Sequence, residues 1–302
     1  MLRRLLGLLI AALALSVGFY QAPDRPLSWL IQPWALPPSQ FEEIQGVLTH
    51  ERDQGRTGAP TLLLLADWGS SLHEWDRVSR TLRDSLRVVS VDLPGSGLSD
   101  PAPGAQYSVQ DQARWLAAYI RDRRLGPVWL VAHGLSADTA WALAQNEPAL
   151  VRGLLLETPL PRDASGHLLS APWLPWVDVP VLDTLSRWVL PLPLVERAVT
   201  ARFGGRPPPV GLAQRTYDIL LREGHREALT ERWRQQRELP PGGPAPALGS
   251  RCLVRQEAST PLAQLARFGG CGFEPTPTGA WDWHELDPEA FVLAVRRWVG
   301  QK

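Results

Sequence analysis

Short apolar runs alternate along this chain with segments of helical periodicity. The runs are mostly apolar and bounded by turn residues, which is typical of parallel strands buried on both faces. They lie at 61–65, 88–91, 128–131 and 151–156. Between them, residues 108–120 carry apolar side chains on one helical face, and Ser108 and Asp111 stand at the spacing of a helix N-terminal cap. Alternating strands and helices predict a parallel sheet with crossover helices.

The pattern changes at both ends of this region. Residues 159–248 consist of short amphipathic segments separated by prolines, which predicts a mostly helical insertion. The sheet is expected to resume near 252–255 and 272–275, and a last helix to begin with Asp287 as cap and Pro288 in its first turn. Two further short strands are expected ahead of the first apolar run, at 42–49 and around Glu51.

The N-terminus predicts a membrane anchor. Arg3 and Arg4 precede an apolar run over 5–20, and no convincing cleavage site follows it. We therefore expect residues 1–20 to be an uncleaved signal anchor that leaves the folded domain on the extracytoplasmic, periplasmic side; secretion after cleavage is the alternative. Residues 21–40, rich in proline and tryptophan, are expected to form a tether against the membrane or the domain.

Composition narrows the possible partners. The 302 residues carry 31 basic and 31 acidic side chains, so no basic field favours nucleic acid. Two cysteines, Cys252 and Cys271, each stand at the start of a predicted strand, and a disulfide or two buried free thiols both remain open. No cysteine or histidine spacing indicates zinc, and no metal or cofactor is expected.

The motif DLPGSGLSD at residues 92–100, directly after a buried strand, resembles the D-x-P-G-x-G-x-S of the α/β-hydrolase fold family. The order of strands, loops and helices resembles the cap-bearing esterase and dehalogenase-like branch of that family. The resemblance implies an α/β class fold, with a mostly parallel central sheet, helices on both faces and a helical cap insertion. The core would comprise 41–158 and 249–302, and the cap 159–248.

The resemblance also locates the positions of a catalytic triad, and all of them depart from the family. The G-x-S-x-G nucleophile elbow corresponds to residues 132–136, which places Gly134 where the serine belongs. Ser259 stands where the triad acid is expected and Trp281 where the histidine is. Backbone N–H groups of Trp68 and Leu135 remain for an oxyanion hole, but without a nucleophile they have nothing to stabilise.

Four other residues are weak alternatives for catalysis. Ser136 is expected to cap backbone N–H groups in the first turn of its helix. Asp67 lies in a D-W-G string similar to the dehalogenase nucleophile elbow, but at the place of the oxyanion loop, and is expected to be a solvated loop carboxylate. Glu157 ends a strand at an alternative acid position, and His284 follows Trp281 by about one turn.

His133 is expected to be a core histidine with its hydrogen bonds satisfied. The indole of Trp281 is expected either to close the vacated pocket or to make it an apolar, aromatic site.

Two hypotheses remain. The first is a membrane-anchored, catalytically inactive α/β-hydrolase-fold protein, a pseudoenzyme that binds an apolar small molecule or a protein partner. The second is an esterase-like hydrolase with a relocated catalytic constellation drawn from Asp67, Ser136, Glu157 and His284.

Overall fold

The computed structural model describes residue 18 and residues 20–162, 187–204, 206–239, 245–276 and 281–300. The predicted signal anchor lies almost entirely outside these residues, as do residues 163–186 of the predicted helical insertion. Among the described residues, no helix combines the length and the apolar character that a membrane crossing requires.

One eight-stranded sheet organises the described chain, with the strand order β1-β2-β4-β3-β5-β6-β7-β8. Strand β2 runs antiparallel to both β1 and β4, and every other neighbouring pair is parallel. The strands are β1 (Ser39–Ile44), β2 (Val47–Gly55), β3 (Thr61–Leu65), β4 (Arg87–Val91), β5 (Val128–His133), β6 (Val151–Glu157), β7 (Cys252–Gln256) and β8 (Gly272–Pro275). The predicted parallel sheet is confirmed.

Helices cover both faces of the sheet, and alternate residues of each central strand supply the two cores. On β3, Leu62 and Leu64 face a cluster with helices α3 and α11, whereas Leu63 and Leu65 face a cluster with α4 and α5. Burial on both faces explains why these strands read as continuous apolar runs. The core helices are α3 (Asp76–Leu82), α4 (Val109–Asp122), α5 (Ser136–Asn146), α10 (Trp283–Leu286) and α11 (Pro288–Val299).

Local sequence signals set the ends of two core helices. The Ser108 hydroxyl accepts a hydrogen bond from the Asp111 N–H at 3.1 Å, so α4 begins where the capping pattern predicts. Asp287 caps α11 in the same way through the Ala290 N–H, at 3.0 Å, with Pro288 at the first helical position. The strands expected at 42–49 and around Glu51 have other bounds in the structure. The turn between β1 and β2 falls inside the first expected strand, at Gln45 and Gly46, which both have positive φ, and β2 continues through Glu51.

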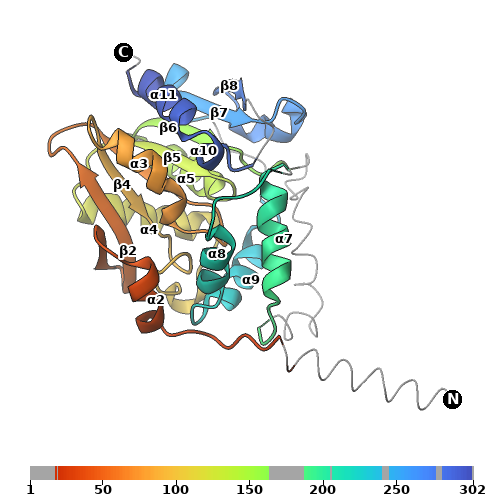
Figure 1. The fold of residues 1–302 in the computed structure, drawn as a ribbon. Coiled ribbons are helices and arrows are strands. Elements are labelled where there is room, and N and C mark those ends of the chain that lie inside the picture. Colours follow the sequence, from red (N-terminus) through yellow and green to blue (C-terminus); the bar gives the residue numbers. More distant parts are fainter. Residues whose placement is uncertain are drawn as a thin grey trace.

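A helical cap is inserted between β6 and β7, as expected. Its described helices are α7 (Leu192–Arg202), α8 (Leu212–Leu220) and α9 (His225–Gln236), which gather beside the sheet in Figure 1. The predicted tether contains a helix, α2 (Leu27–Trp34), which lies against this cap. The Trp34 Nε1–H donates to Asp218 of α8 at 3.0 Å, and Arg25 forms an ion pair with the same carboxylate at 2.6 Å.

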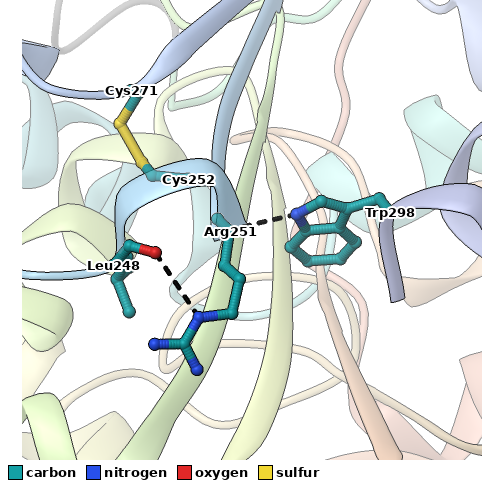
Figure 2. The surroundings of a disulfide bond; sticks show 5 residues. All are labelled: Leu248, Arg251, Cys252, Cys271 and Trp298. Atoms are coloured by element: carbon teal, nitrogen blue, oxygen red, sulfur yellow. Dashed lines mark hydrogen bonds between the residues drawn. A yellow bond between two sulfur atoms is a disulfide. The ribbon is translucent and has the colours of Figure 1, made fainter. Parts of the chain in front are cut away.

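A disulfide joins Cys252, at the start of β7, to Cys271, directly before β8. Figure 2 shows this bond beside Arg251, whose carbonyl accepts a hydrogen bond from Trp298 Nε1–H of α11 at 3.1 Å. Of the two possibilities that the sequence left open, the structure has the disulfide.

Candidate functional site: a filled nucleophile position

The turn between β5 and α5 has the shape of a nucleophile elbow. Gly134 adopts φ +59°, in the left-handed region, between the strand end at His133 and the helix start at Ser136. Its N–H donates to the Glu157 carbonyl of the neighbouring strand at 3.0 Å. The backbone of the elbow is therefore kept although the residue at its apex has no side chain.

Asp67 fills the space that a nucleophile would occupy. A Cβ built on Gly134 would lie 2.1 Å from Asp67 Oδ1, far inside contact distance. The same oxygen accepts the Leu135 N–H at 2.9 Å, the backbone group expected to serve an oxyanion hole. Asp67 is only 6% exposed, so the expectation of a solvated loop carboxylate is wrong. It is buried because the elbow offers it a hydrogen-bond donor and the space of a missing side chain.

The other groups around this carboxylate are also donors. Trp281 Nε1–H points to Asp67 Oδ2 at 3.4 Å, and Arg202 Nη2 lies 3.5 Å from the same oxygen. Arg202, at the end of cap helix α7, also binds Asp282 at 2.7 Å. Burial lowers the pKa of Arg202, but Asp282 and Asp67 outweigh it and raise the pKa above its usual value. A charged arginine thus ties the cap to the carboxylate that fills the site.

Trp281 closes the site from the side. Its indole is partly buried and packs against the small cluster of Trp68, Leu135 and Leu160. Gly134 and Trp281, two of the three predicted triad positions, therefore both lie next to Asp67. Ser259 is exposed on the loop after β7, and no hydrogen bond or ion pair within the described ranges joins it to either of them. Among the described residues, no hydrogen bond joins the Trp68 N–H, the other expected oxyanion donor, to the Asp67 carboxylate.

Two of the alternative catalytic residues are engaged elsewhere. The Ser136 hydroxyl donates to the Ala66 carbonyl at 2.5 Å, so the expectation that it caps helix N–H groups is wrong. The hydroxyl bonds to the Ala66 carbonyl instead, because that carbonyl, at the end of the neighbouring strand β3, lies directly beside the start of α5. Glu157 is fully buried with Arg255 3.9 Å away, and burial raises its pKa to about 7.

His284 lies with His133 and Glu74 rather than over the elbow. Glu74 belongs to the short helical turn Leu72–Trp75, and its Oε1 lies 3.0 Å from His133 Nδ1 and 3.8 Å from His284 Nε2. Burial lowers the pKa of His133, but Glu74, followed by Asp67 and Asp282, raises it to about 9. Burial, followed by the neighbouring His133 and Arg202, lowers the pKa of His284 well below its usual value.

These histidines depart from the sequence-based interpretation. No contact of the described residues joins His284 to Gly134 or to the Asp67 carboxylate, so the structure does not place it as a base there. His133 Nε2 has no hydrogen-bond partner among the described residues, so this core histidine is only half satisfied. Sequence reasoning missed the grouping because the residues are separated by 59 and 151 positions, without a shared motif.

A small hollow, partly open to solvent, lies between the cap and this group. Four of its lining residues are charged, which differs from the apolar, aromatic pocket considered for the vacated site. The lining comprises Ser70, Glu74, Val199, Arg202, Leu212, Thr216, Asp282 and Glu285. The described structure thus has a filled nucleophile position and, next to it, a polar hollow.

Comparison with known proteins places the chain in a structural class. The family model for the alpha/beta hydrolase fold matches residues 60–190. An enol-lactonase from Burkholderia xenovorans superimposes with a TM-score of 0.70 at 18% identity, over 87% of this chain and all of its own. A membrane phospholipase A described as a bacterial virulence factor gives a TM-score of 0.71 at 20% identity, over 99% and 98%. The protein has the α/β-hydrolase fold.

Curated relatives match a shorter stretch. A haloalkane dehalogenase from Bradyrhizobium diazoefficiens is 32% identical over 103 residues, which is 34% of this chain and 33% of the relative. An esterase from Mycobacterium tuberculosis is 33% identical over 109 residues, 36% of each protein. The matched stretch thus spans about a third of these relatives. These similarities agree with the fold, and the site residues alone bear on the activity of this chain.

Proposed function

We propose that this chain is a catalytically inactive α/β-hydrolase-fold protein that acts by binding a protein partner or an apolar ligand. One observation carries the first part: the Asp67 carboxylate occupies the nucleophile position and takes the Leu135 N–H at 2.9 Å. Acyl transfer in this fold needs a nucleophile, a base and a free oxyanion donor. The nucleophile is absent at Gly134, and Asp67 already uses the donor.

The test of inactivity uses a serine-directed fluorophosphonate and a panel of short acyl esters. We expect neither labelling nor turnover above a heat-treated sample. Ser136 provides the control, because it lies two residues after Gly134 and its hydroxyl is already bonded to the Ala66 carbonyl. Stoichiometric labelling that disappears in Ser136→Ala would contradict the proposal.

Exposed aromatic side chains support binding as the mode of action, and favour a protein over a small molecule. Trp188 and Trp29 are 67% and 69% exposed, and Leu194 at the start of α7 is 57% exposed. The Ala22 N–H donates to the Trp188 carbonyl at 2.9 Å, which holds the chain leading to α2 beside the start of α7. Half of the residues that line the hollow next to the site are charged, which suits an apolar small molecule poorly.

A photo-crosslinking amino acid in place of Trp188 tests this face in cells. Leu293 on α11 is a matched control, because it is 59% exposed and lies outside the cap. We expect a discrete crosslinked protein from position 188 and none from position 293. Equal crosslinking at both positions, or none at either, would count against a partner at the cap.

We further propose that the N-terminal segment anchors the folded domain on the extracytoplasmic side. Arg3 and Arg4 ahead of the apolar run 5–20 favour a cytoplasmic N-terminus. The Cys252–Cys271 disulfide supports the proposal, because such bonds persist mainly in oxidising compartments. A C-terminal alkaline phosphatase fusion should be active and a green fluorescent protein fusion dark; the opposite result would refute the orientation.

A second candidate is a hydrolase in which Asp67 itself is the nucleophile, favoured by the place of its carboxylate at the elbow. Its oxygens face only donors, namely the Leu135 N–H, the Trp281 indole N–H and Arg202. An ester formed on Asp67 would need a base to direct water at it. Incubation with haloalkanes in ¹⁸O water distinguishes the two functions: turnover through Asp67 places ¹⁸O in its peptide, and we expect none.

A further inference from the structure

Glu74, His133 and His284 form a compact group of potential metal ligands beneath the filled elbow. They come from the turn before α3, the end of β5 and helix α10. One ligand atom from each lies within 4.8 Å of the others, and their exposed fractions are 2%, 0% and 0%. Three elements far apart in the sequence thus bring two imidazoles and one carboxylate together out of water.

Polar atoms of this group lack hydrogen-bond partners among the described residues. They are Glu74 Oε2, His133 Nε2 and both ring nitrogens of His284. A buried polar atom without a partner costs on the order of 1–3 kcal/mol, so several in one place are an unfavourable arrangement for the protein alone. A cation held by Glu74 Oε1, His133 Nδ1 and His284 Nε2 would give one of these atoms, His284 Nε2, a partner.

The spacing suits a small ion. Two ligands at 2.0–2.1 Å from a tetrahedral ion lie about 3.3 Å apart. Glu74 Oε1 lies 3.0 Å from His133 Nδ1 and 3.8 Å from His284 Nε2, each within about half an ångström of that spacing, and the two imidazole ligand atoms lie within 4.8 Å of each other. The second nitrogen of His133 lies 3.6 Å from Asp282 Oδ1, as in the carboxylate–histidine–metal arrangement of protein zinc sites.

Acidic side chains around the group give a metal ion a path from solvent and neutralise the two nearby arginines. Glu74 also lines the polar hollow, together with Asp282 and Glu285, so acidic side chains lead from solvent to the group. Arg202 is paired with Asp282 at 2.7 Å, and Arg215 with Glu285 at 3.2 Å. Neither arginine therefore adds an unbalanced charge beside an incoming cation.

We propose that Glu74, His133 and His284 bind one divalent transition-metal ion of the zinc class, with water at the remaining position. Imidazole nitrogen is a preferred ligand of zinc and its neighbours in the transition series, whereas calcium and magnesium prefer sites made of oxygen alone. The site is separate from the proposed binding function, and its test measures bound metal rather than partners or ester turnover.

The experiment uses the full chain with a tag that lacks histidine, stripped of metal with a chelator. Zinc is titrated in competition with a chromophoric chelator, and bound metal is counted by mass spectrometry. We expect one ion per chain in the parent, and at least tenfold weaker binding in Glu74→Gln and in His284→Gln. His225→Gln is the matched control, because His225 is buried in α9 outside the group, and it should bind zinc like the parent.

A second measurement covers the case in which a buried substitution prevents folding. Zinc added to the parent should raise its melting temperature in a concentration-dependent way, because a ligand of the folded state alone stabilises it. Crystals of the parent grown with zinc should show an anomalous peak between the three side chains. The proposal is overturned if the parent binds no stoichiometric zinc, or if the peak lies elsewhere.

Discussion

The substitution Gly134→Ala tests whether Asp67 holds the nucleophile position. Two costs are expected. Gly134 has φ +59°, and an L-residue in the left-handed region costs about 1–2 kcal/mol. The new Cβ would also meet Asp67 Oδ1 at 2.1 Å and force the carboxylate off the Leu135 N–H. Loss of such a charged hydrogen bond costs about 1.5–3 kcal/mol, so the sum is about 2.5–5 kcal/mol.

Removing Asp67 separates the two costs. In an Asp67→Gly background the carboxylate is gone, and Gly134→Ala should then cost only the backbone term of about 1–2 kcal/mol. The coupling energy of this double-mutant cycle is therefore expected to be about 1.5–3 kcal/mol, the hydrogen-bond term alone. Gly126 is a matched control, because it has φ +70° and nothing within 4 Å of a built Cβ. Gly126→Ala should cost the backbone term alone in both backgrounds.

Equilibrium unfolding in urea, followed by tryptophan fluorescence and circular dichroism, measures these free energies. If Gly134→Ala costs the same with and without Asp67, the carboxylate does not occupy the elbow, and the part of the explanation of inactivity that rests on Asp67 is wrong. If Gly134→Ala matches Gly126→Ala in the parent, the close contact is absent.

Three further outcomes follow from the structure. Burial, followed by the positive charge of Arg222, lowers the pKa of His225 from 6.5 to about 3 in the folded protein. As the pH falls from 6.5 to 5, His225 therefore becomes protonated in the unfolded chain but not in the folded one. Stability should thus fall by about 2 kcal/mol from pH 6.5 to 5 through this group, and His225→Gln should remove that share of the slope in urea unfolding. Cys252→Ser with Cys271→Ser should cost about 3 kcal/mol, from the loop that the bond closes, whereas equal stability would contradict a formed disulfide. Trp281→His should cost about 1–2 kcal/mol, and a neutral effect in the same assay would mean that the indole does not close the site.

The central sheet could be predicted from the sequence because its strands are buried on both faces. Leu62 to Leu65 serve two cores at once, so the run is apolar at each of these positions whatever the rest of the fold does. The start of α4 was predictable for a local reason, since Ser108 and Asp111 lie within one turn. Helix α2 was not, because prolines at 26 and 33 indicate a break, and its contacts with α8 come from residues almost 200 positions away.

The candidate site was predictable only as a set of departures from a pattern. The sequence indicates that Gly134 cannot be a nucleophile, but it holds no sign that Asp67, from a different strand end, enters the vacated space. The burial of Asp67 could not be predicted either, because its neighbours in the sequence form a polar loop of the kind that is usually exposed to solvent. Its position depends on a donor from the elbow and on Arg202 from the cap.

Gly134 and Asp67 therefore form one structural unit. With Asp67 in place, a serine at position 134 would meet a carboxylate 2.1 Å from its Cβ, and the Leu135 N–H would still be in use. Neither a histidine at Trp281 nor an acid at Ser259 changes that, because both act on a nucleophile that is already correctly placed. Any route from this chain to an active hydrolase accordingly has to remove the Asp67 carboxylate before it restores the serine, and the arginine that now pairs with Asp67 would then depend on Asp282 alone.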